Sequence, residues 1–69
     1  MSNRSSVTIG PKIRKLRRRE GYTQKQLAAK LSKSESAVRM WELGFSEPSL
    51  SDFKRLIEIF DVSADYLLK

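Results

Sequence analysis

Apolar side chains recur at helical spacing in separate stretches of the chain. Ile9, Ile13 and Leu16 lie four and then three positions apart, so a helix here has one apolar face and basic residues on its other faces. Further along, apolar residues recur at intervals of three, three, one and three; they are Leu50, Phe53, Leu56, Ile57 and Phe60. This second pattern predicts a helix with a broad buried face.

Capping residues mark where these helices begin and end. Thr8 can cap the first helix, with Pro11 in its first turn, and Gly21 follows its end. Ser49 can cap the helix of residues 50–60, because Asp52 completes an S-x-x-D box three residues later.

Between them, residues 23–42 read as two short helices joined by a tight turn. Thr23 opens a T-x-x-Q capping box, and Ser34 is a second N-cap. The helix after Ser34 buries Val38 and Trp41, three residues apart, and leaves a polar outer face. Such a pair of helices is typical of the helix-turn-helix arrangement.

A last short helix is predicted after Ser63, which can cap it. The apolar side chains around it can pack on the core or on a second copy of the chain; they are Val62, Tyr66, Leu67 and Leu68. With no strand pattern elsewhere, the sequence predicts an all-α domain of five helices.

Charge is divided unevenly along the 69 residues. Residues 1–39 hold eleven Lys and Arg against two acids, a net charge of +9, whereas residues 40–69 have a net charge of −3. A basic half indicates a polyanionic partner, with nucleic acid favoured over an anionic membrane; the alternative is a basic face that only serves solubility. No apolar run approaches the ~20 residues that span a bilayer, so we expect a cytoplasmic protein without a membrane partner.

Composition argues against catalysis. The chain has neither cysteine nor histidine, so we expect no disulfide, no usual zinc site and no cofactor. It also lacks paired carboxylates in a predicted cleft and a glycine-rich phosphate loop, and a chain of this length has little room for a substrate pocket. We therefore expect a binding protein rather than an enzyme.

Specific motifs resemble the Cro/CI-type phage-repressor family, also called XRE. They are T-Q-x-x-L-A-x-x-L, S-x-x-x-V-x-x-W-E, then Gly44, then E-P-S-L, and the likeness extends from Ile9 to Leu68. The resemblance implies a five-helix, lambda-repressor-like DNA-binding domain over residues 9–69, preceded by a flexible arm over residues 1–8. It also implies a bacterial or phage-encoded protein.

The resemblance implies that four side chains read bases from the major groove; they are Glu35, Ser36, Arg39 and Met40. Glu35 can accept a hydrogen bond from cytosine, or serve only the helix dipole. Arg39 can contact guanine, hold a phosphate or pair with Glu35. Met40 fits a thymine methyl group, whereas Ser36 can bond to several bases and so specifies little.

The family likeness also implies contacts with DNA phosphates, which fix register without reading sequence. Gln24 is expected to bind the backbone at the N-terminus of the first helix of the pair, where the helix dipole favours an anion. Lys33 and Ser34 flank the groove at the turn. The remaining candidates are the backbone of Phe45 and Ser46 and the side chains of Arg14 and Arg18, which can equally be solvated.

Two structural expectations follow from the same resemblance. Arg17 is expected to form an ion pair with Glu42 that orients the helices rather than adding net stability. The family turn has glycine where this chain has Ser32, at a position that needs a positive φ. Serine there costs roughly 1 kcal/mol relative to glycine.

Together these features predict sequence-specific binding to double-stranded DNA by a transcriptional regulator, a repressor by family habit. Residues 34–42 would lie in the major groove, with a homodimer on an inverted-repeat operator whose half-sites are ~34 Å apart. The alternatives are an antitoxin or a protein-interaction module with the same fold. Because the chain ends after the last family helix, we expect a stand-alone regulator or a fragment with a further C-terminal domain or partner protein.

Overall fold

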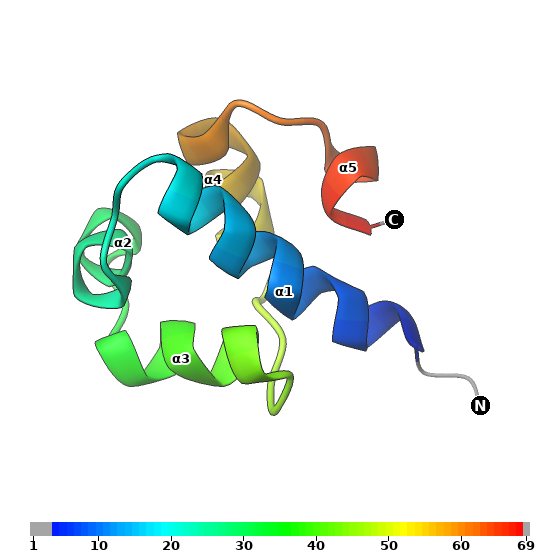
Figure 1. The fold of residues 1–69 in the computed structure, drawn as a ribbon, viewed down its shortest axis with the longest axis horizontal. Helices are drawn as coiled ribbons and strands as arrows, with labels where there is room; N and C mark the ends of the chain where they lie inside the picture. The colour runs from blue at the N-terminus through cyan, green and yellow to red at the C-terminus, as the bar shows by residue number, and fades with distance from the viewer. Residues whose placement is uncertain (1–3, 69) are drawn as a thin grey trace.

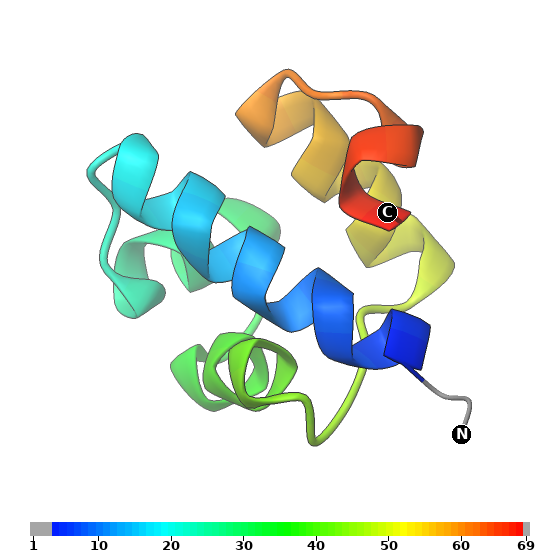
Figure 2. The ribbon, with the colours of Figure 1, turned by 45° about the vertical axis from the view of Figure 1, so that its right-hand side comes forward.

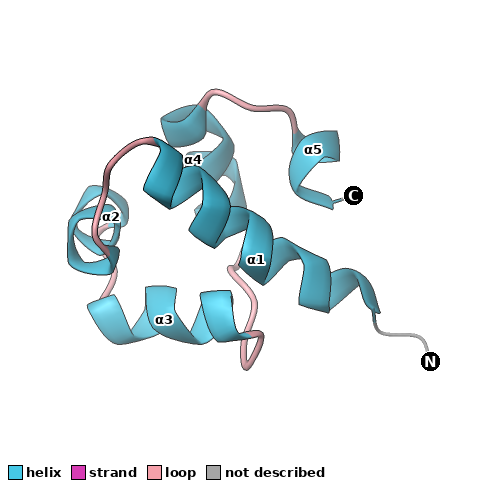
Figure 3. Ribbon diagram, in the orientation of Figure 1, coloured by secondary structure: helices cyan, strands magenta, loops and turns pink. Residues whose placement is uncertain are grey.

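The computed structural model describes the backbone of residues 4–68 and the side chains of residues 9–68. The helices in this range are α1 (Arg4–Arg19), α2 (Gln24–Leu31), α3 (Glu35–Leu43), α4 (Leu50–Phe60) and α5 (Ala64–Leu68) (Figure 1). Over the described residues the chain contains only helices and loops, as Figure 3 shows. The predicted all-α class with five helices is confirmed.

Helix α1 runs across the molecule between the other helices (Figures 1 and 2). It packs against α3 and α5, while α2 packs against α3 and α4, and α4 packs against α5. The apolar side chains of all five helices meet in one core, which contains Ile13, Leu16, Leu27, Ala28, Leu31, Val38, Trp41, Leu56, Phe60 and Leu67. The predicted stripes of α1, α2 and α3 therefore face one another.

The end of α1 confirms the predicted role of Gly21. Gly21 has a φ of 78°, in the left-handed region that favours glycine. Its N–H donates to the carbonyl of Arg18, and the N–H of Tyr22 donates to the carbonyl of Arg17, both at 3.0 Å. These two bonds form a Schellman motif, which satisfies carbonyls that the helix itself leaves free.

The start of α1 differs from the prediction. The helix begins at Arg4, so Thr8 lies inside it and does not cap it, and Pro11 lies in the helix interior. A proline has a helical φ but no N–H, and its ring crowds the carbonyl four residues earlier, so α1 continues through Pro11 with one hydrogen bond fewer. The predicted flexible arm of residues 1–8 thus overlaps α1 from Arg4 onward, while residues 1–3 lie outside the described residues.

One prediction about apolar residues is wrong, and another is resolved between its two alternatives. Leu50 was expected in the buried face of α4 but is 71% exposed, because it is the first residue of the helix and lies beyond the core. On α5, Leu67 is buried and Val62 packs partly against the core, whereas Tyr66 and Leu68 are exposed. Packing on the core, one of the two predicted alternatives, therefore holds for Leu67 and in part for Val62, whereas Tyr66 and Leu68 are left at the surface.

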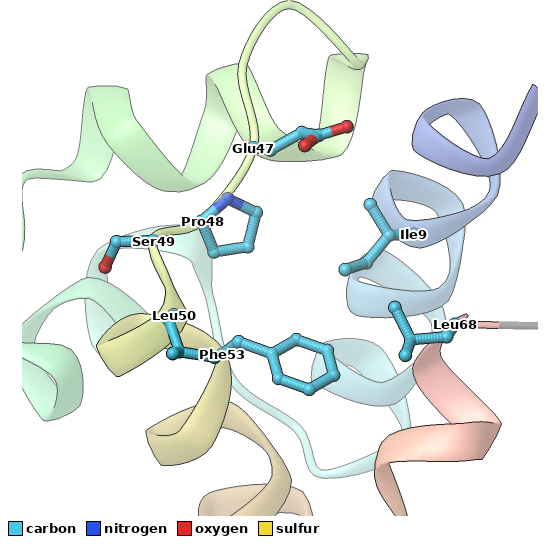
Figure 4. A pocket seen from close by; sticks show the side chains of 7 residues that line it. All are labelled: Ile9, Glu47, Pro48, Ser49, Leu50, Phe53 and Leu68. Atoms are coloured by element: carbon cyan, nitrogen blue, oxygen red, sulfur yellow. The ribbon is translucent and has the colours of Figure 1, made fainter. Parts of the chain in front are cut away.

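The exposed Leu50 and Leu68 border an apolar groove between α1, α4 and α5 (Figure 4). Figure 4 shows the rings of Pro48 and Phe53 between Leu50 and the side chain of Ile9. Glu47 is the charged residue at its edge. The groove is lined by segments from both ends of the chain.

Candidate nucleic-acid interface

The local structure of α2 and α3 is set by their caps. Thr23 Oγ1 accepts from the backbone N–H of Gln26 at 3.0 Å, and Gln26 Oε1 accepts from the N–H of Thr23 at 2.9 Å. Ser34 Oγ accepts from the N–H of Ala37 at 3.1 Å at the start of α3. Both predicted caps are confirmed, since each satisfies N–H groups that the helix leaves free.

The turn between these helices passes through a left-handed residue. Ser32 has φ 56° and ψ 40°, and its N–H bonds back to α2. The prediction that this position needs a positive φ is confirmed. The backbone of a residue that has a side chain is strained in this region, so Ser32 makes the folded protein less stable than glycine would.

The inner face of α3 is fixed in the core by Val38 and Trp41, which are 0% and 4% exposed. The backbone of α3 also lies directly against α1 at Gly10. A Cβ atom on Gly10 would lie 2.9 Å from the carbonyl oxygen of Glu42 and closer still to that of Trp41. Only glycine allows this approach of the two helices, which holds α3 close to α1.

The predicted ion pair between Arg17 and Glu42 is present at this same junction. Arg17 Nε donates to Glu42 Oε2 at 2.6 Å, and Arg17 Nη2 donates to Glu42 Oε1 at 3.1 Å. Arg17 Nη1 also donates to the carbonyl of Tyr22 at 2.8 Å. The hydrogen bond and charge of Glu42 raise the pKa of Arg17 above its usual value, despite the opposing effect of burial. One bidentate pair therefore joins α1 to the C-terminal half of α3.

The outer face of α3 carries the predicted base-reading residues. Glu35, Ser36 and Arg39 are exposed. Met40 is half-buried, although it is not among the residues of the core or those packed against it. Expecting Met40 to be fully bare was too simple, because its position on the helix lies toward the half-buried Ala37. Among the described residues, no hydrogen bond or ion pair joins the side chains of Glu35, Ser36 or Arg39 to another helix.

The structure also places the expected phosphate-binding residues. Gln24 Nε2 donates to Glu42 Oε1 at 3.0 Å, so Gln24 is linked to the ion pair of Arg17. Lys33 Nζ lies 3.4 Å from Asp52 Oδ2, which joins the turn to the start of α4. Sequence reasoning predicted neither contact, because both partners lie far along the chain.

The loop after α3 holds two further candidates. The N–H groups of Phe45 and Ser46 both point to the carbonyl of Met40, at 3.0 and 3.4 Å. These backbone donors are therefore used within the protein. The side chain of Phe45 is 75% exposed, and Arg14 and Arg18 are exposed on α1.

One outward residue was missed by the sequence analysis. Leu43 belongs to α3 rather than to the loop, and it is 59% exposed. It lies seven residues after Ser36 and four after Arg39, so helical periodicity places it on the outer face. Extending the predicted helix by one residue would have included it.

Over the described residues, no group of acidic or other ligating side chains is arranged to hold a metal ion. None of the described helices combines the length and apolar character needed to cross a membrane. The features that remain for a functional role are the exposed side of α3, its basic surroundings on α1 and the apolar groove.

In the comparison with family models, the helix-turn-helix family matches residues 13–67. The matched range includes α2, the turn and α3 at its centre.

Characterised relatives and solved structures agree with this match. The transcriptional regulator ImmR of Bacillus subtilis is 31% identical over 90% of this chain, which spans 49% of the relative's length. The restriction-modification controller protein C.AhdI of Aeromonas hydrophila is 30% identical, with a TM-score of 0.79 over 88% of this chain and 92% of its own. SinR, a master regulator for biofilm formation, was solved in complex with DNA; it is 29% identical, with a TM-score of 0.80 over 88% of this chain and 98% of its own.

Proposed function

The chain belongs to the helix-turn-helix family, and from this membership we propose that it binds double-stranded DNA sequence-specifically as part of a transcriptional regulator. It spans about half the length of the curated relatives it matches, so this activity is assigned to the DNA-binding portion. The observation that carries the proposal is the contrast between the anchored inner face of α3 and its bare outer face. A polar helix held rigidly with one side open is suited to the major groove.

Within this binding mode, the N-terminal half of α3 approaches the base edges. Glu35 and Ser36 are at its first turn, and Met40 follows one turn later. The basic residues of α1 and the turn attract the phosphate backbone of DNA. This attraction gives a function to the net charge of +6. We expect the protein to act in the bacterial cytoplasm and to have a binding rather than a catalytic role.

We propose further that two copies bind an inverted repeat. The longest extent of the Cα trace is 33 Å, which suits two copies lying side by side on half-sites ~34 Å apart. Leu50 and Leu68 provide exposed apolar surface for the contact between copies. We also propose that the regulator is a repressor, and this part of the proposal rests on the family alone.

Selection from a pool of random DNA duplexes tests the function. The bound duplexes should share an inverted repeat, and the affinity for that sequence should fall steeply as salt rises, because bound phosphates release counterions. Recovery of unrelated sequences with equal affinity at every salt concentration would contradict the proposal.

A second candidate, a protein-interaction module, has the apolar groove in its favour (Figure 4). The double variant Arg39→Ala, Met40→Ala separates the two roles, because neither residue lines the groove. Loss of DNA binding by a variant that stays folded, with a melting temperature lowered by only a few degrees, supports the DNA-binding role. Failure of the wild type to select any duplex would favour the module.

A further inference from the structure

A small open cavity lies beside α3, where three helices meet. It has a volume of about 260 Å³ and is lined by Arg14 of α1, Gln24 of α2, and Arg39, Glu42 and Leu43 of α3. Residues far apart in the chain are thus brought to one place at the edge of the proposed DNA-binding surface. Figure 1 shows α1, α2 and α3, the helices from which the lining residues come.

The arginines of the chain differ in what their guanidinium groups contact. Arg17 bonds to Glu42, Arg19 to Glu20 and the carbonyl of Phe60, and Arg55 to the carbonyl of Lys30. Among the described side chains and backbone, no hydrogen bond or ion pair joins the guanidinium of Arg14 or Arg39 to another group. Five donors on each of these two guanidinium groups are directed to a ligand or to solvent.

The charge within the cavity is positive despite the presence of Glu42. Both carboxylate oxygens of Glu42 accept from Arg17, and Oε1 also accepts from Gln24. The negative charge of Glu42 is therefore balanced by Arg17, which leaves the charges of Arg14 and Arg39 to attract an anion. Gln24 uses one amide N–H for Glu42 and retains a second one to donate.

The position of Arg39 on α3 separates it from Ser36 and Met40, whereas Glu35, one turn earlier in the helix, lies on the same flank as Arg39. At 100° per residue, Arg39 lies between the outward Ser36 and Glu42, which faces α1. Met40 lies on the other flank of the helix. Arg39 is thus on the side of α3 that faces Arg14 and Gln24. With α3 in the major groove, this side would face the sugar-phosphate backbone rather than the base edges.

We propose that Arg39 does not read a base but binds one phosphodiester group of the DNA backbone together with Arg14 and Gln24. This inference rests on the proposed function. It assigns base reading to Glu35, Ser36 and Met40, and it makes the cavity a phosphate clamp built from α1, α2 and α3. Three helices holding one phosphate would fix how deeply α3 enters the groove, because backbone contacts set orientation.

The test compares single variants on the duplex that the wild type selects. Arg39→Ala and Arg14→Ala should each weaken binding about tenfold or more, since hydrogen bonds to charged groups are worth ~1.5–3 kcal/mol. Each should also reduce the slope of log affinity against log salt by about one, and by similar amounts on mismatched duplexes. Arg39→Lys keeps the positive charge and should retain most of the salt slope.

Lys15→Ala is the matched control, because Lys15 is an exposed cation next to Arg14 that does not line the cavity. It should change affinity much less than Arg14→Ala. Thermal melts of all variants should equal that of the wild type, since the substituted side chains are exposed.

Repeating the selection with Arg39→Ala gives the decisive readout. The same sequence should be recovered as with the wild type. Relaxed choice at a guanine position would overturn the inference and show that Arg39 reads a base, and so would an unchanged salt slope for both alanine variants. If the wild type itself binds no duplex, the proposed function fails first, and the clamp fails with it.

Discussion

The two faces of α3 have opposite environments, although both belong to the same helix of nine residues. The inner face has Val38 and Trp41 in the core, the ion pair of Glu42, and the backbone in contact with Gly10. The outer face has the exposed Glu35, Ser36, Arg39 and Leu43 and the half-buried Met40. Substitutions on the inner face should therefore change folding, and substitutions on the outer face should change binding alone. The following predictions test this division, from the largest expected effect to the smallest.

Trp41→Ala should have the largest effect. Removing a buried aromatic side chain costs about 3–5 kcal/mol, which approaches the whole stability of many small domains. We expect a protein that is largely unfolded at 37 °C by circular dichroism. The neighbouring Met40→Ala should lower stability by no more than about 1 kcal/mol, because Met40 lies outside the core. Equal losses for both variants would contradict the division of the two faces.

Glu42→Gln should be the next most harmful. Breaking a buried ion pair costs about 3–5 kcal/mol, because the remaining charge is left unpaired. We expect the lower end of this range, since Arg17 keeps its bond to the carbonyl of Tyr22. Urea unfolding measures the change. Glu35→Gln is the same substitution on the outer face and should change stability by less than about 0.5 kcal/mol.

Gly10→Ala tests the close approach of α1 and α3. The added methyl group would meet the backbone of α3, so the helices must move apart, at a cost of about 1–3 kcal/mol. Alanine otherwise favours a helix over glycine, so helix propensity predicts the opposite sign. A lower melting temperature supports the close contact, whereas a higher one would show that α3 is not held there.

Ser32→Gly should raise stability by roughly 1 kcal/mol, because glycine adopts a φ of 56° without strain. For a domain of this size the melting temperature should rise by about 4–8 °C. Asp61→Gly provides a second case, since Asp61 ends α4 with a φ of 54°. If neither variant is stabilised, the turn before α3 is held by contacts rather than strained.

Asp52 should give the smallest effect, and only in acid. Burial alone would raise the pKa of its carboxyl group, but hydrogen bonds from Ser49 and the charge of Lys33 hold that pKa below its usual value. Its contribution to stability is therefore full above the unfolded pKa of ~3.9 and is lost as pH falls through the folded pKa. Melting temperatures between pH 6 and pH 2 should show the difference between the wild type and Asp52→Asn shrinking. A difference that stays constant would exclude this linkage.

Local signals in the sequence predicted most of the elements correctly. The caps at Thr23, Ser34 and Ser49 satisfy N–H groups only three residues away, so each can be read without knowing the fold. Two errors concern helix boundaries, at Thr8 and Leu43. The other errors occur where neighbours distant in sequence decide the outcome. Periodicity placed Leu50 in the buried face of α4, but no other element covers it there.

At the candidate DNA-binding surface, the sequence likewise did not reveal contacts between distant parts of the chain. Family likeness indicated Arg17 and Glu42 as a pair, and the structure contains it. It did not indicate that Gln24 joins this pair, that Lys33 meets Asp52, or that Arg14 and Arg39 share a cavity. Each of these arrangements brings together segments far apart in the chain, and its geometry depends on how the helices pack.

The sequence by itself determined the helical class, the turn between α2 and α3 and the division of charge along the chain, because spacing, capping and composition are local properties. Tertiary structure decided how closely α3 approaches α1, that Leu50 is left uncovered and which arginines keep their donors available. Those properties depend on packing between residues distant in the chain, which no local pattern records.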